Sequence, residues 1–402
     1  MIAIVGAGLA GLACALVLHR RGRKFLVLEA SDSVGGRQKT TRMGGFTLDH
    51  GFQVVLDSYQ SVREVADIPS LRPQRFTSGA LIFPNHRPEY FCSPLEDPAA
   101  ACLSPALPLA DKLRLALLGI RALAAPDARL QVRCAGPRDT STLEFLERRR
   151  FGPQSIECFF RPFFGGVLLD DELSTSAGLF LYYLKKFATG RAWIPERGIQ
   201  ALPESIAAQL PRGSVRTGAR VAALSGKTIT LDTGETITPE KTVLAVDEPS
   251  LRSLLGLEPT APGRSVSVAY FKSRESLYPR RCIALPPGRG RAVRHFVQTT
   301  NIAPAFAPQG WHLVSATILG TPAPDAAASA AAEIDEFFPQ AASSLEHLET
   351  IHVPYAVPVQ PPGFAAKETP ALPSDVHACG DWRNGASIES AIRSGLDLAK
   401  NL

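Results

Sequence analysis

The first thirty residues alternate between apolar runs and glycines in the order expected for a strand, a loop, a helix and a second strand. The run Ile2–Val5 combines branched and small apolar side chains, which is typical of a strand buried on both faces. Leu9–Leu18 carries apolar residues at helical spacing, and Gly22 ends that helix. Phe25–Leu28 predicts a second strand, which stops at Glu29. The pattern therefore predicts a strand–loop–helix–strand unit of an α/β fold.

Glycines join the first strand to the helix in the spacing G-x-G-x-x-G. Gly6 permits a tight turn, Gly8 lets the backbone approach a pyrophosphate, and Gly11 lets the helix pack closely on the strand. The free N–H groups and the dipole at the helix start favour phosphate there. Glu29 follows Gly6 by 23 residues, where a carboxylate can accept hydrogen bonds from ribose hydroxyls. We therefore predict a dinucleotide site. The alternative is a glycine-rich turn in another kind of α/β protein. The predicted residues of the dinucleotide site are Gly6, Ala7, Gly8, Gly11, Glu29 and Ala30.

Two further turns allow the backbone to approach a ligand. In Gly35-Gly36-Arg37 the glycines permit close approach, and the arginine can clamp a diphosphate or cap a ribityl chain through its fork of donors. A predicted hairpin over residues 44–56 contains a second glycine turn at Gly51.

The chain between Tyr59 and about Lys186 has a different character, with frequent prolines and helices alternating with short strands. Leu109–Ala125 predicts a helix that is apolar all round and is broken by Lys112, Arg114 and Arg121. A helix with apolar residues on all sides favours burial against neighbouring elements. The alternative is an interfacial helix that helps to collect a lipidic substrate from a membrane surface.

Phenylalanines surround Arg161 in the stretch Phe159–Phe164. They predict either the wall of an apolar cavity or ordinary core packing, and both interpretations stay open.

Alternating patterns later in the chain predict a set of strands. A meander of short strands covers Arg216–Val221, Thr228–Leu231, Thr236–Ile237 and Thr242–Val246. Ser265–Phe271 and Trp311–Ile318 suit a sheet that forms the floor of a substrate cavity, and Asp325–Phe338 is an alanine-rich helix. At the C-terminus a strand ends in Gly380-Asp381, and Ser387 is a candidate N-cap for a helix that continues to Lys400.

Composition limits the class of protein. A length of 402 residues allows two domains, and a net charge of +5 gives no case for nucleic acid as a partner. Seven cysteines without a C-x-x-C pair argue against a disulfide framework and against a structural zinc site, so no metal is predicted. Because no signal peptide precedes the first strand and no run of about 18 apolar residues occurs, we expect a cytoplasmic protein, either soluble or peripherally associated with a membrane.

These motifs, taken together in this order, resemble the superfamily of flavin-containing amine oxidases and phytoene desaturases. The stretch DHGFQVVLDSY, which begins at Asp49, is similar to its phytoene dehydrogenase-like branch, and that branch also carries a stretch similar to the RPFFGGV that begins at Arg161. The resemblance implies FAD as a non-covalent cofactor. It also implies a discontinuous, Rossmann-like FAD-binding domain of the glutathione reductase type, and an α+β substrate-binding domain. We expect the former over 1–58, 190–248 and 354–402, and the latter over 59–189 and 249–353.

The resemblance also assigns residues to parts of the cofactor. It implies Glu29 on the adenosine ribose, Gly36 and Arg37 near the diphosphate, Gly51 and Phe52 beside the isoalloxazine ring, and Val221 at the adenine. Asp381, after Gly380, would bind the ribityl hydroxyls. The helix start at Ser387 and Ile388 would face the N1–O2 edge of the flavin and stabilise the charge of its reduced form.

The predicted activity is that of an FAD-dependent oxidoreductase acting on a small apolar organic substrate. A hydride would pass from an isoprenoid- or polyene-like molecule to flavin N5, and the electrons would go on to oxygen, a quinone or another external acceptor. The alternatives are a flavin amine oxidase, for which Lys185, Lys186 and Lys272 are unmatched candidates for an active-site lysine, and a non-catalytic prenyl- or lipid-binding protein on the same fold. The catalytic candidates are His50, Trp193 and Tyr355, with Trp382 as a further aromatic residue for the flavin ring.

Overall fold

The strand–loop–helix–strand unit at the N-terminus forms the centre of a parallel sheet. A computed structural model of the chain describes residues 1–94, 96–127, 130, 134, 136–258, 263–339, 341–366, 370–383 and 385–402. Within them every pairing in this sheet is parallel, so the predicted α/β class is confirmed. The strands, in spatial order, are β10 (Val215–Arg216), β2 (Phe25–Leu28), β1 (Ile2–Val5), β14 (Lys241–Leu244) and β20 (Val376–Ala378).

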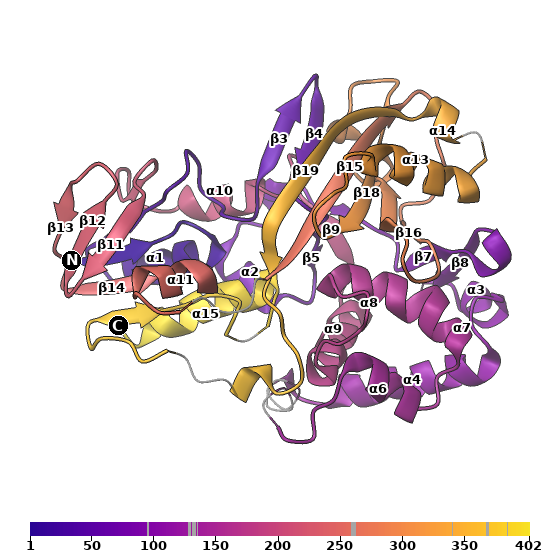
Figure 1. The fold of residues 1–402 in the computed structure, drawn as a ribbon, viewed down its shortest axis with the longest axis horizontal. Helices are drawn as coiled ribbons and strands as arrows, with labels where there is room; N and C mark the ends of the chain where they lie inside the picture. Colours follow the sequence, from indigo (N-terminus) through magenta and orange to yellow (C-terminus); the bar gives the residue numbers. More distant parts are fainter. Residues whose placement is uncertain are drawn as a thin grey trace.

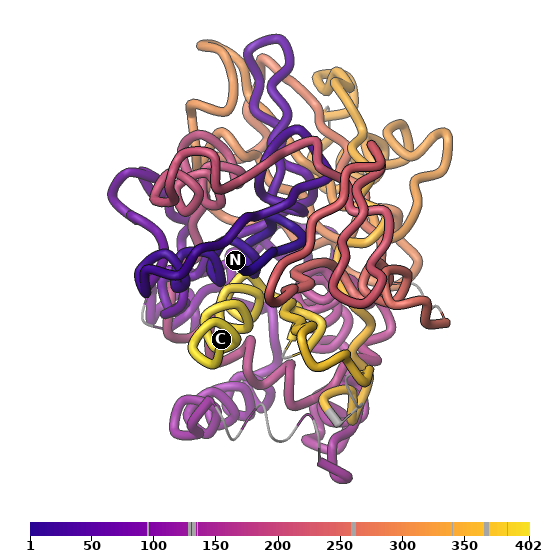
Figure 2. The backbone as a smooth tube through the Cα atoms, turned by 90° about the vertical axis from the view of Figure 1, so that its left-hand side faces the viewer, coloured from indigo at the N-terminus to yellow at the C-terminus, as the bar shows by residue number. Residues whose placement is uncertain are grey.

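Helices from the two ends of the chain pack against each other beside this sheet. Helix α1 (Leu9–Arg20) and helix α15 (Ile388–Lys400) lie side by side, as the indigo and yellow tubes in Figure 2 show. A Cβ atom on Gly395 would lie 2.1 Å from the carbonyl oxygen of Ala10, so the contact requires glycine. As expected, Ser387 caps α15 by accepting a hydrogen bond from the backbone N–H of Ser390.

A second, mixed sheet lies beside the parallel one (Figure 1). Its strands, in spatial order, are β19 (Glu346–Val357), β15 (Arg264–Ser273), β18 (His312–Leu319), β17 (Val293–Gln298), β16 (Ile283–Leu285), β7 (Gly79–Ile82) and β8 (Glu89–Cys92). One face packs on helix α13 (Ala326–Phe337) through Phe271, Phe296 and Ala316. Because neighbouring residues of a strand point to opposite faces, His295 and Thr317 belong to the other face.

Smaller sheets and a group of helices complete the fold. The short strands are β3 (Thr40–Met43), β4 (Phe46–Asp49), β5 (Val55–Leu56), β6 (Gln74–Arg75), β9 (Ala192–Ile194), β11 (Val221–Ser225), β12 (Thr228–Leu231) and β13 (Thr236–Ile237). The remaining α-helices are α2 (Gln60–Val65), α3 (Pro98–Leu103), α4 (Leu109–Ala124), α6 (Thr142–Arg148), α7 (Pro153–Ser155), α8 (Arg161–Leu168), α9 (Ala177–Thr189), α10 (Ala201–Ala207), α11 (Glu248–Leu254), α12 (Thr299–Ile302) and α14 (Ala341–Ser344).

Three expectations from the sequence are wrong. The hairpin predicted over residues 44–56 does not form, because β4 pairs with the preceding strand β3 and β5 pairs with β9 in another sheet. The strand predicted over Arg216–Val221 is two strands, β10 and β11, which belong to different sheets. Gly218 between them has φ +63°, a left-handed conformation that ends an extended run.

Helix α4 is not buried on all sides. It packs on the neighbouring helices through Leu118 and Leu115, whereas Leu113, Leu117 and Ile120 are exposed. The apolar residues of this helix outnumber the positions that its neighbours can cover.

A buried carboxylate ties the hairpin β3–β4 to the loop before α10. Asp49 accepts hydrogen bonds at Oδ1 from the hydroxyl of Thr40 (2.6 Å) and from the backbone N–H of Ile199 (2.9 Å). Burial raises the pKa of Asp49 to about 6, although these two donors act in the opposite direction. The group fixes the backbone immediately before His50 and Gly51.

This raised pKa leads to a testable prediction for Asp49→Asn. Between pH 3.8, the ordinary pKa, and about 6, the folded state binds more protons at this group than the unfolded state, so its contribution to stability falls as the pH rises. The amide keeps an oxygen for both donors and carries no charge. We expect the stability of the variant relative to wild type to increase between pH 4 and pH 6, by at most about 3 kcal/mol, as measured from melting temperatures.

The matched variant Asp49→Ala separates charge from hydrogen bonding. It leaves both donors without their acceptor and should lower stability by about 1–3 kcal/mol at pH 8. Parallel pH profiles for wild type and Asp49→Asn would contradict the prediction.

Candidate active site

Residues of both main sheets line a large cavity. Its volume is about 1140 Å³. The carboxyl ends of β1 and β2, and the residues after β14 and β20, line one end. This is the edge of the parallel sheet, where α/β folds bind ligands, and β1 lies at the point where the strand order reverses. All seven strands of the mixed sheet contribute to the lining, as expected for a cavity floor.

The glycine loop at β1 has the geometry that its spacing predicts. Gly6 has φ +102°, and a Cβ atom there would lie 2.5 Å from the carbonyl oxygen of Ala245. A Cβ atom on Gly11 would lie 2.0 Å from the carbonyl oxygen of Gly6, so glycine is required where α1 meets the strand. Gly8 is different, because a Cβ atom there would meet nothing within 4 Å. The loop therefore leaves open space in the cavity at the position expected for a pyrophosphate.

Glu29, which directly follows β2, is hydrogen-bonded to the glycine loop after β1. Its Oε2 accepts a hydrogen bond from the backbone N–H of Ala7 (2.7 Å), and its Oε1 accepts from the backbone N–H and the hydroxyl of Ser31. The side chain is buried and lines the cavity together with Ala30. Ala7 and Gly11 support this wall from behind and do not line the cavity.

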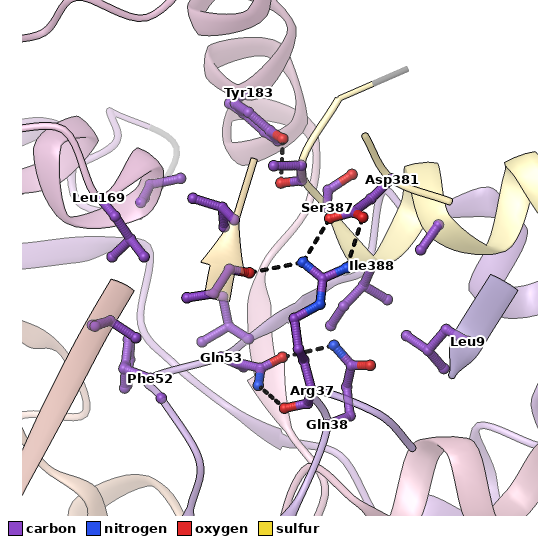
Figure 3. Close-up of a pocket in the computed structure, with 18 of the residues that line it drawn as sticks. Leu9, Arg37, Gln38, Phe52, Gln53, Leu169, Tyr183, Asp381, Ser387 and Ile388 are labelled. Atoms are coloured by element: carbon purple, nitrogen blue, oxygen red, sulfur yellow. Dashed lines mark hydrogen bonds and ion pairs between the residues drawn. The ribbon is translucent and has the colours of Figure 1, made fainter. Parts of the chain in front are cut away.

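The turn Gly35-Gly36-Arg37 brings a charged pair into the cavity. Arg37 forms a bidentate ion pair with Asp381, with distances of 2.9 Å and 2.6 Å, and also donates to the carbonyl oxygen of Ala356 (Figure 3). The sequence predicted both charged residues as ligands but did not predict that they pair with each other across 344 positions. Gly36 packs against Gly8, so the two glycine turns lie next to each other.

A glutamine pair, which was not predicted from the sequence, supports the same turn. Gln53 donates to the backbone oxygens of Arg37 and His50, and its own oxygen accepts a hydrogen bond from Gln38 (Figure 3). Gln53 lies in the stretch that resembles the phytoene dehydrogenase-like branch, which is the signal that could have identified it.

The end of the cavity at the carboxyl edge of the parallel sheet, where we predict the dinucleotide, is called the nucleotide end below. Gly51 and Phe52 lie between this end and the rest of the cavity. Gly51 has φ +79°, and the ring of Phe52 packs against the imidazole of His295 at a centroid distance of 4.9 Å. His295 also lines the cavity and shares a hydrogen bond between its Nε2 and the hydroxyl of Thr317 (2.9 Å). Burial, with a smaller contribution from Arg294, lowers the pKa of His295 to about 3. A neutral histidine thus holds Phe52 in place, and no motif in the sequence marks it.

The N-terminus of α15 points into the cavity at Ser387 and Ile388, with the hydroxyl of Tyr183 bonded to the carbonyl oxygen of Ala386 (Figure 3). Val221 lines the wall at the start of β11, and Gly380 lines it beside Asp381. The structure therefore brings together, around one cavity, the predicted residues Gly6, Gly8, Glu29, Ala30, Gly36, Arg37, Gly51, Phe52, Val221, Gly380, Asp381, Ser387 and Ile388.

The catalytic candidates do not lie together. His50 lines the cavity, and its Nε2 is 2.9 Å from the hydroxyl of Thr41. Burial and the charge of Lys39 lower the pKa of His50. Trp193 is buried in the core beside β5, Tyr355 lies under the guanidinium of Arg37, and Trp382 donates to the carbonyl oxygen of Val246. None of these three aromatic residues is part of the cavity lining.

The far end of the cavity is apolar. Phe159, Phe163 and Phe164 line it, whereas Phe160 is fully buried in the helical core, so both interpretations of this segment are correct for different residues. The phenylalanines of the lining are Phe52, Phe76, Phe91, Phe159, Phe163, Phe164 and Phe187.

Among the described residues the only lysine of the lining is Lys112. The three candidate lysines from the sequence are paired elsewhere: Lys185 and Lys186 bind Asp127, and Lys272 binds Glu346.

The residues at the nucleotide end fit FAD. Gly8 leaves room for the pyrophosphate, the start of α15 presents backbone N–H groups, and the carboxylates of Glu29 and Asp381 provide acceptors for sugar hydroxyls.

Comparison with known proteins agrees with this fit. The sequence model of the family "Flavin containing amine oxidoreductase" matches residues 9–402. A 4,4'-diapophytoene desaturase (4,4'-diaponeurosporene-forming) of Staphylococcus haemolyticus is 42% identical over 65 residues, which are 16% of this chain and 13% of that protein. The match therefore spans a small part of the relative's length.

Solved structures share the whole fold. An oxidoreductase from Methanosarcina mazei has a TM-score of 0.73 at 17% identity, with 99% of each chain covered. Wild-type putrescine oxidase bound to putrescine has a TM-score of 0.70 at 18% identity, covering 100% of this chain and 98% of that one. At such identities the likeness concerns the fold alone. Since the family model covers nearly the whole sequence, the chain belongs to the flavin containing amine oxidoreductase family, an oxidoreductase family whose cofactor, FAD, fits the residues of this cavity.

Proposed function

We propose that this protein desaturates an apolar, isoprenoid- or polyene-like substrate: a hydride leaves one carbon and a proton leaves the neighbouring carbon, so that a carbon–carbon double bond forms. When bound, FAD supplies the hydride acceptor at its N5 atom, and the electrons then go to oxygen, a quinone or another external acceptor. The observation that carries the proposal is the continuity of the cavity from the nucleotide end into a wall of phenylalanines.

The carboxylates of the lining argue against an amine substrate. Among the described residues they are Glu29, Asp247 and Asp381, each of which follows a strand of the parallel sheet and so belongs to the nucleotide end. Within the described residues, the phenylalanine-lined end has no carboxylate to pair with an ammonium group, and a buried unpaired charge is costly. An apolar substrate instead gains free energy from burial against these rings.

The protein's own contribution is orientation and electrostatics. The imidazole of His295 fixes Phe52, and Phe52 follows the turn at Gly51 that we place beside the flavin ring. His50 is the catalytic candidate that lines the cavity, and its lowered pKa keeps the imidazole neutral and able to accept a proton. The dipole of α15 favours negative charge at Ser387 and Ile388.

We also propose the discontinuous division into 1–58, 190–248 and 354–402 for FAD and 59–189 and 249–353 for the substrate. All five strands of the parallel sheet fall within the first set of ranges. Strand β19 runs through the boundary after residue 353 and so joins the two parts.

Gly8→Ala and Gly11→Ala separate cofactor binding from folding. The methyl group of Gly8→Ala meets no protein atom. The free energy of unfolding without FAD, measured by thermal unfolding, should therefore stay within about 1 kcal/mol of the wild-type value. FAD affinity should fall about tenfold or more, because the methyl group occupies the space of the pyrophosphate and weakens its charged hydrogen bonds. Fluorescence titration with FAD measures this change.

Gly11→Ala is the matched comparison. Its methyl group would collide with the backbone of Gly6, so the fold itself should lose about 1–3 kcal/mol or more. If Gly8→Ala binds FAD as tightly as wild type does, the pyrophosphate does not approach Gly8.

Loss of either acidic ligand should weaken FAD retention. We expect Glu29→Ala and Asp381→Ala each to reduce affinity by about tenfold, since each removes a charged hydrogen-bonding partner of the cofactor site. Absorbance of flavin retained after gel filtration provides the measurement. Glu235→Ala is the control, because Glu235 is an exposed acid that pairs with Arg216. Full retention in both site variants would show that the cofactor lies elsewhere.

A panel of substrates tests the reaction class. Mixed anaerobically with the holoenzyme, polyenes should bleach the flavin absorbance rapidly, whereas amines and porphyrinogens should not. Phe163→Asn should slow bleaching about tenfold through lost apolar contact, with FAD retention unchanged. Bleaching by amines alone would replace the proposal with an amine oxidase. A purified protein that stays colourless after addition of FAD would favour a non-catalytic prenyl- or lipid-binding protein.

A further inference from the structure

Helix α4 lies at the edge of the molecule (Figure 1). One face of it exposes apolar side chains to the solvent. Its exposed side chains are Leu109 (69% exposed), Leu113 (64%), Leu117 (49%), Ile120 (63%) and Leu123 (44%). In the described part of the chain, six of the nine exposed large apolar residues lie on this helix or at Leu103, just before it. Such a concentration marks an interaction surface.

The orientation of α4 is fixed from the inside by a charged residue. Asp111 is buried and accepts hydrogen bonds from the backbone N–H of Gly152 and the hydroxyl of Ser155. Leu118 and Ala122, on the same side of the helix, are buried, and Leu118 packs into the helical core. The outward apolar face is therefore a property of the folded protein.

Basic residues border this face. At 3.6 residues per turn, about 100° per residue, Arg114 and Arg121 lie along one edge of the apolar face and Lys112 lies along the other. Asp111, the single acidic residue of the helix, pairs with Arg114, and the ammonium of Lys112 donates to the carbonyl oxygens of Cys102 and Ser104. The three cations and one acid leave α4 with a net charge of +2. An apolar face with cations at its edges is the pattern of a helix that lies in the interface of an anionic membrane.

The same helix forms a wall of the cavity. Lys112, Leu115, Ala116 and Gly119 line it, and Ala116 is also exposed on the outer face. The apolar face and the cavity therefore meet along one side of α4.

We propose that α4 docks the protein onto an anionic lipid surface, with this side of the cavity next to the acyl chains. Within the described residues no helix is long and apolar enough to cross a membrane, so the contact would be peripheral. A second copy of the chain fits less well, because a helix face of about 24 Å by 10 Å is far smaller than the roughly 800 Å² that each partner buries in a stable interface. A protein partner would also cover the cavity at Ala116.

Vesicle binding by the full-length holoprotein tests this proposal without turnover, so the result does not depend on the proposed reaction. We expect cosedimentation with vesicles of phosphatidylcholine and phosphatidylglycerol. The triple variant Leu113→Ser, Leu117→Ser, Ile120→Ser should bind on the order of 100-fold more weakly. Its flavin absorbance and melting temperature should match wild type, since all three side chains are exposed.

Two single variants sharpen the test. Arg121→Gln should weaken binding about fivefold on anionic vesicles and leave the weaker binding to pure phosphatidylcholine unchanged. A tryptophan introduced as Ile120→Trp should be quenched by brominated acyl chains.

The control is Leu257→Ser, with Leu257→Trp for quenching, because Leu257 is 38% exposed at a distance in sequence from α4. Neither change should have an effect. Absence of vesicle binding by wild type, unchanged binding of the triple variant, or a dimer in analytical ultracentrifugation that only the triple variant disrupts would each overturn the proposal.

Discussion

The close approach of backbone to backbone at the start of α1 is the constraint on which the rest of the structure depends. Gly11 lies against the carbonyl of Gly6, and Gly395 lies against the carbonyl of Ala10, at distances that no side chain would permit. These contacts set helix α1 on the sheet and helix α15 on α1. Because they do so, the N-termini of both helices and the carboxyl ends of the parallel strands open into one cavity.

The Arg37–Asp381 ion pair completes this arrangement across the chain. It joins the turn after β2 to the loop after β20, with the carbonyl of Ala356 from β19 as a third partner. One guanidinium thus connects the parallel sheet, the mixed sheet and the C-terminal segment. Since a buried charge needs its partner, the three segments have to come together for the pair to form.

The two ends of the cavity differ in chemistry because they belong to different layers. The nucleotide end is built from loops that follow parallel strands, which present backbone N–H groups and carboxylates. The far end is built from strand faces and from helices α4, α8 and α9, which present phenylalanine and leucine. One of these helices, α4, also carries the apolar surface of the molecule, so the same element can serve both the cavity and an interface.

The sequence by itself determined the strand–loop–helix–strand unit at the N-terminus. The tight turn at Gly6 and the close packing at Gly11 could be predicted because each depends on local backbone geometry, and Ser387 could be recognised as a cap for the same reason. The class of the fold followed from the order of such units. Local patterns also located the strands that line the cavity, because alternation and apolar runs report burial directly.

Only the tertiary structure decided which residues meet. It paired Arg37 with Asp381, set His295 against Phe52, placed Trp193 in the core, and left Leu113, Leu117 and Ile120 outside. These outcomes depend on contacts between segments that are far apart in the chain. The residue type alone does not determine which of those segments packs against a side chain. The sequence shows that α4 is apolar. Which face of α4 points outward is set by Asp111, whose hydrogen-bond partners lie about forty residues away in the chain.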